Sequence, residues 1–254
     1  MSLAPNPTFD LSGKQALITG GGRGIGAAAA AVLAQAGAQV TLCSRSADEL
    51  EATAGAIVEA GYQAEWFTLD VTDIAAVKRE IAARGPFDIL LNNAGVNRIR
   101  PLTEITEDDY DVVLGLNLKS ALFVAQAVAK GLLEAKRPGS IINVSSQMGH
   151  VGGAGRCLYS GSKWGIEGIT RCMAIELGPH DIRVNTLCPT FIETEMTRPI
   201  LDTPGVREFV LSRIKLGRLG RMDELAGPLL LLASDAGSLM TGGSVMVDGG
   251  WTAG

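Results

Sequence analysis

The amino-acid sequence predicts an α/β fold in which a doubly wound parallel sheet of about seven strands carries helices on both faces. Short runs of β-branched and aliphatic residues alternate with longer Ala-rich or amphipathic stretches of helical periodicity. Most of the short runs are continuously apolar, as expected for strands that are covered on both faces. No linker, repeat or low-complexity tract breaks this alternation, so residues 1–254 are predicted to form a single domain.

The individual elements follow from these runs. Strands are expected at Gln15–Thr19, Gln39–Cys43, Ala64–Leu69, Asp88–Leu91, Ser140–Val144, Ile182–Leu187 and Ser244–Val247. Helices are expected at Gly24–Ala36, Ala47–Ala60, Asp73–Arg84, Glu107–Ala135, Leu158–Leu177 and Asp223–Ser234. Glycines follow several of these helices as stop signals. Successive strand–helix–strand units of this kind pair in parallel through right-handed crossovers.

Residues 189–221 depart from the alternation. The segment has mixed charges, two internal prolines and only short helical patterns, yet it keeps many apolar residues. An excursion of about 30 residues after a strand is more often a binding segment than a plain connection. We therefore expect residues 189–221 to form a substrate lid within the single domain.

The bulk composition excludes several classes of protein. The net charge is -5 with no block of like charges, so neither nucleic acid nor an anionic membrane is an expected partner. The start lacks the pattern of a signal peptide, and no run of about 18 apolar residues is seen. The four cysteines, at positions 43, 157, 172 and 188, form no C-x-x-C pair. A cytoplasmic protein without a disulfide scaffold or a metal site is therefore predicted.

Thr19–Gly26 reads TGGGRGIG and lies between the first predicted strand and the first predicted helix. Glycines there let the backbone turn tightly and approach a pyrophosphate, while the helix N-terminus supplies N–H donors. The pattern alone would also fit a plain turn, but its position in a βαβ unit predicts a dinucleotide site. The cofactor-binding residues expected here are Gly20, Gly22, Arg23, Gly24, Ile25 and Gly26.

The end of the second predicted strand indicates which dinucleotide is bound. NAD sites place a carboxylate there, about 20 residues past the glycines, to bind the ribose 2′-OH. Here Ser44 and Arg45 occupy that place, and Arg23 can reach the same area. Two guanidiniums and a hydroxyl suit a 2′-phosphate. NADP(H) is therefore favoured over NAD(H), the alternative being that both arginines only solvate the surface.

Tyr159 and Lys163 are four residues apart in a predicted helix, so they lie on one face of it. A free phenol titrates near ~10, and a close ammonium would lower this pKa toward neutrality. Such a tyrosine can give a proton to a carbonyl oxygen or take one from an alcohol. Ser145 and Ser146 follow the fifth predicted strand, at the sheet edge where open α/β folds bind ligands. Three glycines in the same helix predict a close neighbour, whether another helix, a subunit or a cofactor.

These motifs, in order and spacing, resemble the short-chain dehydrogenase/reductase family over nearly the whole chain. The motifs are TGGGRGIG, NNAG at residues 92–95, Asn117, Ser146, YSGSK at residues 159–163, and the terminal VDGGW. The resemblance implies a Rossmann-type fold, a nicotinamide cofactor and a homotetramer. Within the family, the chain is similar to the gluconate 5-dehydrogenase-like and 3-oxoacyl reductase-like members.

The resemblance also assigns roles to residues. Tyr159 is expected to be the general acid/base, Lys163 to lower its pKa and hold the nicotinamide ribose, Ser146 to hydrogen-bond the reacting oxygen, and Asn117 to support a proton path. Further cofactor contacts are expected from Asp70, Val71, Asn93, Ala94, Gly95, Pro189, Ile192 and Thr194. Thr190 stands where the family usually has glycine, and a threonine does not easily adopt a positive φ, so this loop is expected to take another course.

The substrate is less well indicated. Arg98 and Arg100 follow the NNAG motif and are candidates to contact a substrate anion, as in family members that act on sugar acids and polyols. Gln147 and His150 follow Ser146 and are further candidates, but His150 has no second ligand beside it in sequence to suggest a metal. The expected reaction interconverts a secondary alcohol and a ketone on a small polar substrate. A 3-oxoacyl thioester, with Arg156 adding to a basic patch, and a non-catalytic nucleotide-binding protein are the alternatives.

Overall fold

The computed structural model describes residues 8–193 and 197–254. Its seven strands form one parallel sheet in the order β3-β2-β1-β4-β5-β6-β7. The strands are β1 (Gln15–Thr19), β2 (Gln39–Ser44), β3 (Ala64–Thr68), β4 (Ile89–Asn92), β5 (Gly139–Val144), β6 (Ile182–Pro189) and β7 (Ser244–Val247). The predicted doubly wound fold is confirmed, and every strand lies where the apolar runs placed it.

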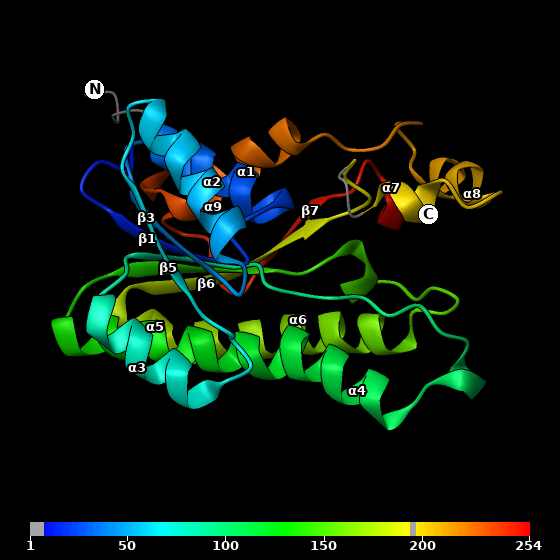
Figure 1. Ribbon diagram of the computed structural model, residues 1–254, viewed down its shortest axis with the longest axis horizontal. Helices are drawn as coiled ribbons and strands as arrows, with labels where there is room; N and C mark the ends of the chain where they lie inside the picture. Colours follow the sequence, from blue (N-terminus) through cyan, green and yellow to red (C-terminus); the bar gives the residue numbers. More distant parts are fainter. Residues whose placement is uncertain (1–7, 194–196) are drawn as a thin grey trace, which may run out of the picture.

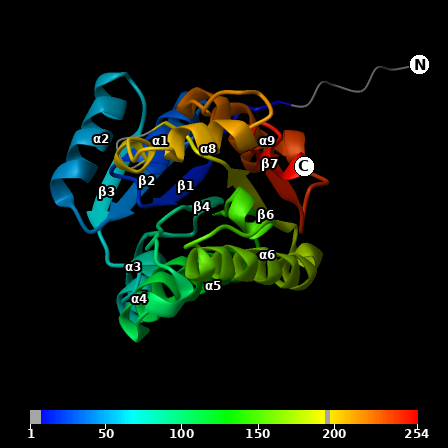
Figure 2. The same cartoon turned by 90° about the vertical axis from the view of Figure 1, so that its right-hand side faces the viewer.

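Helices cover both faces of the sheet (Figures 1 and 2). One layer holds α1 (Gly24–Gln35), α2 (Ala47–Glu59) and α9 (Ala226–Ala233), and the other holds α3 (Ile74–Arg84), α4 (Glu107–Leu114), α5 (Ala121–Ala135) and α6 (Cys157–Leu177). Neighbouring strand residues point to opposite layers, so Leu17 packs in the core under α3 and α5 while Ile18 packs in the core under α1. This two-sided burial is the reason for the continuously apolar strands.

The single helix predicted over residues 107–135 is interrupted. A π-helix, Gly115–Ser120, separates α4 from α5 and carries Asn117. Among the residues that the structure describes, Glu107–Ala135 is also the one helix long and apolar enough to cross a bilayer, with a mean hydropathy of 1.7. Every 18-residue part of it contains Lys119 and Ser120, so no continuously apolar run of that length is present, and 44% of its most apolar part is buried in the fold, as in a core helix.

Beyond β6, the described part of residues 189–221 forms two short helices, α7 (Arg198–Leu201) and α8 (Val206–Arg213), at the right-hand end of Figure 1. Val210 and Ile214 are buried there in a small apolar cluster with Trp251 from the C-terminus. The Trp251 ring stacks on Phe191 and meets Phe209 edge-on. The segment is thus held down by a core of its own, beside the carboxyl ends of the strands.

Candidate active site

The glycine loop between β1 and α1 has the conformation that a close ligand requires. Gly20 and Gly24 have φ values of 65° and 56°, which residues with a side chain rarely adopt. A Cβ on Gly26 would lie 2.1 Å from the Gly20 carbonyl oxygen, so only glycine lets α1 pack this close to the turn. A Cβ on Gly22 would likewise meet Glu49.

The N-terminus of α1 is open toward this loop. Its N-cap residue, Arg23, makes no side-chain capping bond, and no acidic residue lies in the first turn. The loop is held from behind, because the Thr19 hydroxyl accepts the backbone N–H groups of Asn93 and Ala94, and the Asn93 amide donates to the carbonyls of Thr19 and Gly20. Free N–H donors at a positive helix end, over a glycine cradle, fit a pyrophosphate. Asn93 and Ala94 therefore stabilise the conformation of the glycine loop through these hydrogen bonds.

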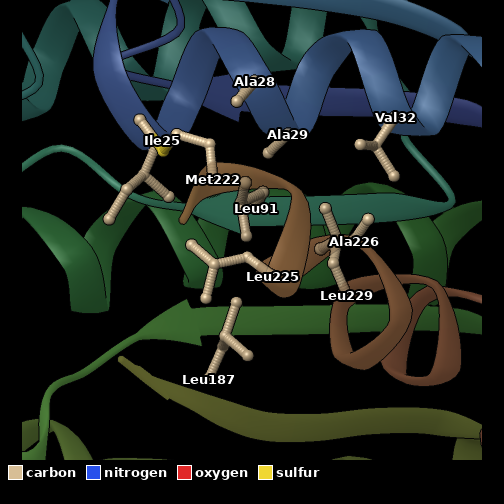
Figure 3. A pocket seen from close by; sticks show the side chains of 10 residues that line it. All are labelled: Ile25, Ala28, Ala29, Val32, Leu91, Leu187, Met222, Leu225, Ala226 and Leu229. Atoms are coloured by element: carbon tan, nitrogen blue, oxygen red, sulfur yellow. The ribbon is translucent and has the colours of Figure 1, made fainter. Parts of the chain in front are cut away.

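Behind the loop, a small apolar cavity of about 10 Å³ lies between α1, α9 and the sheet (Figure 3). Ile25, Leu91, Leu187 and Met222 are among the residues that line it. The space holds about one water and has no polar partner for it, so it is a packing gap and not a cofactor site. Because the Ile25 side chain faces this gap, the predicted contact between Ile25 and the cofactor can be made only by the Ile25 backbone.

The residues expected around the adenosine lie at the ends of β2 and β3. Arg23 pairs with Glu49 at 3.1 Å, but both side chains are largely exposed, so the pair is weak and the guanidinium stays available. Ser44 bonds locally to the backbone of Ser46. Asp70 lies near Arg45: burial opposes ionisation of Asp70, but bonds from Thr72 and the charge of Arg45 hold its pKa below the usual value. Val71 is buried beside it.

Ser146, Tyr159 and Lys163 meet at the carboxyl end of β5. Ser146 caps the short 3-10 helix Gln147–Gly149 and also lies in hydrogen-bonding reach of the Tyr159 hydroxyl. Lys163 is one turn of α6 beyond Tyr159, its Nζ lying 5.7 Å from the centre of the phenol ring. Lys163 is buried and donates a 2.7 Å bond to the Val144 carbonyl. The structure thus brings three of the four predicted catalytic residues together at the carboxyl end of β5.

The electrostatics of this cluster differ from the prediction. Burial raises the pKa of the Tyr159 phenol, and the opposing effects of Ser146 and Arg156 do not overcome it. Burial also lowers the pKa of Lys163 to about 8, against the opposing charges of Cys188 and Glu167. In the chain by itself, burial therefore outweighs the effect expected of the lysine, because desolvation disfavours both charges, and the shift expected with an oxidised nicotinamide bound stays a prediction.

Asn117 is buried and bridges two elements. Its side-chain amide donates to the Val96 carbonyl at 2.8 Å and to the Ser162 hydroxyl at 3.1 Å, and its carbonyl accepts the Val96 N–H. These bonds fasten the loop after β4 to α6. A Cβ on Gly95 would approach the same amide at 3.2 Å, which gives Gly95 a packing role there.

Arg98 and Arg100, the candidates for a substrate anion, are already paired. Both reach the buried carboxylate of Asp109, at 2.9 and 3.3 Å, and Arg98 also meets Asp108. Asp109 in turn completes a capping box with Thr106 at the start of α4. The two arginines therefore fasten the loop after β4 to α4, and the geometry does not favour them as anion contacts.

Of the other substrate candidates, Gln147 lies in the site and His150 is turned away. The Gln147 carbonyl oxygen accepts the Ser146 hydroxyl at 2.6 Å. The His150 ring instead faces Glu167 and Cys188. Arg156, which precedes Tyr159 by one helical turn, was expected only as part of a basic patch in the case of a thioester substrate. It is half-buried, its guanidinium lies over the Phe191 ring, and its charge acts on the Tyr159 phenol.

The loop after β6 keeps to the sheet. Pro189 is the last residue of β6, and the Thr190 N–H bonds to the Val247 carbonyl. Thr190 lies outside the positive-φ region, so it departs from the family glycine without strain. Ile192 forms a bridge with Gly220, its side chain is buried, and its carbonyl accepts the Thr197 hydroxyl, so its predicted nicotinamide contact is left to its backbone N–H. Thr194 lies outside the described residues.

The three glycines of α6 were predicted to mark a close neighbour of the helix. A Cβ on Gly165 would come within 2.9 Å of Leu118, which explains that glycine by close helix packing. Gly161 and Gly168 are exposed, and within the described chain nothing lies near the positions of their missing side chains. The expected close neighbour is therefore seen at one of the three glycines.

The sheet order, the glycine loop at α1 and the Ser–Tyr–Lys cluster define the class of protein: a nucleotide-dependent oxidoreductase on a Rossmann-type fold. A family model described as "Enoyl-(Acyl carrier protein) reductase" matches residues 20–252. D-erythrulose reductase of Gallus gallus is 37% identical over 245 residues, 96% of this chain and 98% of that protein. Gluconate 5-dehydrogenase of Gluconobacter oxydans is 36% identical over 251 residues, 96% of both chains.

Solved structures agree with these relatives. A gluconate 5-dehydrogenase from Burkholderia cenocepacia, in complex with NADP and tartrate, superimposes with a TM-score of 0.92 at 35% identity, covering 97% of this chain and 98% of that one. The chain belongs to the short-chain dehydrogenase/reductase family and is an NAD(P)-dependent oxidoreductase.

Proposed function

We propose that the protein interconverts a hydroxy acid of the sugar-acid type and its keto form, using NADP(H), with Tyr159 as the general acid/base. The observation that supports an acidic substrate is Arg156. Among the described residues no carboxylate pairs with it, burial lowers its pKa, and it lies beside the Tyr159 phenol. A partly desolvated guanidinium without a partner binds a carboxylate strongly.

The pairing of Arg98 and Arg100 with Asp109 sharpens this proposal. Their charges are compensated, which leaves Arg156 as the arginine near the tyrosine whose charge no carboxylate of the described residues compensates. The same pairing weakens the basic patch that an acidic carrier protein would need, so a 3-oxoacyl thioester is less well supported. The bound tartrate of the Burkholderia relative is itself a hydroxy acid, which accords with an acidic substrate here.

In this mechanism the bound nicotinamide supplies or accepts the hydride at the substrate carbon. Tyr159 gives its phenolic proton to the carbonyl oxygen in reduction and removes the hydroxyl proton in oxidation. The Ser146 hydroxyl, now held by Gln147, turns to donate to the same oxygen. The Lys163 ammonium favours the phenolate that forms. Arg156 binds the substrate carboxylate and so fixes the position of the reacting carbon relative to Tyr159.

Asn117 enters this proposal through its backbone. Its side-chain amide is engaged on both sides, with Val96 and Ser162. The residue lies in a π-helix, a feature that often marks functional sites because it disturbs the regular helical bonds. We assign the proton path from Lys163 to the Asn117 main chain and leave the side chain a positioning role.

Tyr159→Phe tests the acid/base assignment. Turnover is expected to fall by roughly 10²-fold or more, the contribution of a positioned general acid, with little change in NADPH affinity. Tyr110→Phe, on an exposed part of α4, is the matched control and is expected to behave as the unmodified enzyme. Steady-state kinetics and NADPH fluorescence titration report the two quantities. Near-normal turnover in the Tyr159→Phe enzyme would remove Tyr159 from the chemistry.

A substrate panel tests the role of Arg156. With sugar acids, Arg156→Ala is expected to raise KM by roughly 10- to 100-fold, the loss of one charge-assisted hydrogen-bonded pair. With neutral polyols and ketones of the same length KM is expected to change little. Acetoacetyl thioesters belong in the same panel, because a preference for them would replace the sugar-acid proposal. Equal KM changes for acids and polyols would contradict the anchor.

NADP(H) preference rests on Arg45, Arg23 and Ser44 at the end of β2 and in the glycine loop. Arg45→Ala is expected to lower kcat/KM for NADPH by about tenfold or more while leaving that for NADH nearly unchanged, because the part of the cofactor that the lost cation would bind is the 2′-phosphate. Arg79→Ala, whose exposed guanidinium pairs with Glu80 on α3, is the control. Equal or better use of NADH by the unmodified enzyme would contradict this part of the proposal.

We further propose a cytoplasmic homotetramer. The resemblance to the family implies this assembly, and exposed apolar side chains on α5 and α6, among them Leu122, Leu133 and Ile175, are suited to subunit contact. The exposed Gly161 and Gly168 lie on the same helix α6, where a neighbouring subunit would explain them. Light scattering after gel filtration measures the mass, and a monomer at micromolar concentration would contradict the assembly.

A further inference from the structure

His150, Glu167 and Cys188 converge from three separate elements. His150 follows the 3-10 helix after Ser146, Glu167 lies in α6 one turn beyond Lys163, and Cys188 lies near the end of β6. Glu167 Oε1 is 3.4 Å from both His150 Nε2 and Cys188 Sγ, and those two atoms are 3.6 Å apart. A nitrogen, an oxygen and a sulfur thus form a nearly equilateral triangle of potential metal ligands.

The size of this triangle matches a tetrahedral zinc site. Zinc binds thiolate sulfur at about 2.3 Å and histidine nitrogen or carboxylate oxygen at about 2.0–2.1 Å. At tetrahedral angles these bond lengths separate the ligand atoms by about 3.3–3.6 Å. The three observed separations, 3.4, 3.4 and 3.6 Å, are those of one face of such a tetrahedron. A fourth position remains for water.

The atoms around the triangle are arranged as an outer shell. The second oxygen of Glu167, Oε2, accepts the hydroxyls of Ser244 at 2.6 Å and Thr186 at 3.1 Å, which orients Oε1 toward the other two groups. The buried Ser145 hydroxyl lies close enough to Glu167 to help lower its pKa but makes no hydrogen bond of good geometry. Ligating carboxylates are commonly fixed by such partners, and an unsatisfied hydroxyl suits a bound water.

Access and charge also allow an ion. The His150 side chain is 25% exposed, which provides a route from solvent, while Glu167 and Cys188 are buried. On binding, the Cys188 S–H bond breaks, its proton leaves to solvent, and the sulfur lone pair forms the bond to the metal. Two anionic ligands then neutralise a divalent ion, so nearby Lys163 faces no net repulsion.

We propose that His150, Glu167 and Cys188 bind one divalent transition metal ion, with Zn²⁺ the best match. The ion fastens the segment after Ser146 to α6 and to β6, the three elements that carry the catalytic serine, the tyrosine–lysine pair and the start of the 189–221 segment. The role is to hold these elements in place and does not include the hydride transfer. It stands independently of the proposed substrate.

Cobalt(II) titration of the full chain tests the site, because a cobalt–thiolate bond adds charge-transfer absorption in the near ultraviolet. The exposed Cys157 and Cys172 are first replaced by serine so that neither contributes. One equivalent per chain is expected to bind with this absorption, and Zn²⁺ is expected to displace it. His180→Gln, at an exposed histidine, is the control and should leave the titration unchanged.

Substitutions at the three residues show whether they bind a metal or merely form hydrogen bonds with one another. Cys188→Ser is expected to abolish the thiolate absorption, and Glu167→Gln or His150→Gln to weaken binding more than the roughly 10–100-fold cost of losing an outer partner. Ser244→Ala should show that smaller loss. Absence of the absorption at one equivalent, or its survival in Cys188→Ser, would overturn the proposal.

X-ray absorption covers the case in which a variant fails to fold. It is measured on the zinc-loaded chain that carries only the Cys157 and Cys172 replacements. One sulfur at about 2.3 Å with nitrogen or oxygen neighbours is the expected shell. A shell without sulfur, or no retained zinc after desalting, refutes the site. Neither result depends on which substrate the enzyme uses, so this test and the tests of the proposed function fail separately.

Discussion

Tyr159 shows how one residue's chemistry is set by opposed effects. Burial favours its neutral phenol, whereas the nearby Ser146 hydroxyl and the charge of Arg156 favour the phenolate, and burial prevails. Lys163, with a pKa of about 8, loses part of its charge just above neutral pH. In the proposed mechanism the neutral phenol would therefore act as the acid in reduction, and the charge of an oxidised nicotinamide would favour its use as a base.

The direction of the Tyr159 pKa shift predicts how alcohol oxidation and ketone reduction depend on pH. Because the pKa of Tyr159 is raised, kcat/KM for alcohol oxidation is expected to climb from neutral to alkaline pH, while ketone reduction stays high at neutral pH and declines above it. Arg156→Ala removes a cation that lowers this pKa, so the alkaline limb should move to still higher pH, and Arg156→Lys should restore it. Steady-state profiles in both directions measure this, and a shift toward acid would contradict the assignment.

Among the elements, the turn from β1 into α1 depends most on the absence of side chains. Gly26 packs against the Gly20 carbonyl, and Asn93 closes the loop from the neighbouring strand β4. The backbone groups that would meet a pyrophosphate are therefore placed by contact between two elements. The helix dipole then acts at a fixed point.

Gly26→Ala is expected to displace this turn. The new Cβ would lie 2.1 Å from a carbonyl oxygen, so the loop must move, at a cost of about 1–3 kcal/mol in unfolding free energy and at least about tenfold in NADPH affinity. Gly55→Ala, inside α2 with nothing near its Cβ position, is the control and should be neutral or stabilising by up to about 1 kcal/mol. Thermal melts and fluorescence titration measure both. Unchanged NADPH affinity in the Gly26→Ala protein would contradict close backbone approach.

At the scale of the whole molecule, the C-terminus secures the segment that lies beside the carboxyl ends of the strands. Trp251 packs on Phe191 and Phe209, and Asp248 bonds to Thr252 and Gly250 to hold the final turn. Residues near the start of the segment and near the end of the chain thereby form one apolar cluster. The lid assigned to residues 189–221 remains a prediction that this cluster supports.

Trp251→Ala is expected to release the segment. Loss of a buried tryptophan costs about 3–5 kcal/mol in a core, and in this small cluster we expect KM for the substrate to rise more than kcat falls. Trp66→Ala, at a partly exposed position on the far edge strand β3, is the control and should leave KM unchanged. Kinetics and limited proteolysis within residues 197–221 report the opening. If the Trp251→Ala protein is less stable but its KM and its rate of proteolysis are unchanged, the apolar cluster does not hold a substrate lid.

Local sequence patterns predicted much of the structure. The apolar runs located the central strands because burial on both faces leaves a continuous signature. Glycines marked the turn before α1 because a positive φ at Gly20 and close packing at Gly26 disfavour side chains there. The spacing of four residues placed Tyr159 and Lys163 on one helical face, whereas the roles expected of them came from the family resemblance. The interruption at Gly115–Ser120 escaped notice, since a π-helix has the same composition as the helices it joins.

Contacts between distant segments decided the rest. Asp109 compensates Arg98 and Arg100 from α4, Arg156 is left unpaired beside the tyrosine within the described chain, and burial reverses the expected shift of the phenol pKa. His150, Glu167 and Cys188 stand far apart in the chain and meet only when α6 packs on β6. Periodicity reports which face of an element is buried, but charge compensation, desolvation and ligand geometry depend on which elements pack together, and that is settled by the folded arrangement.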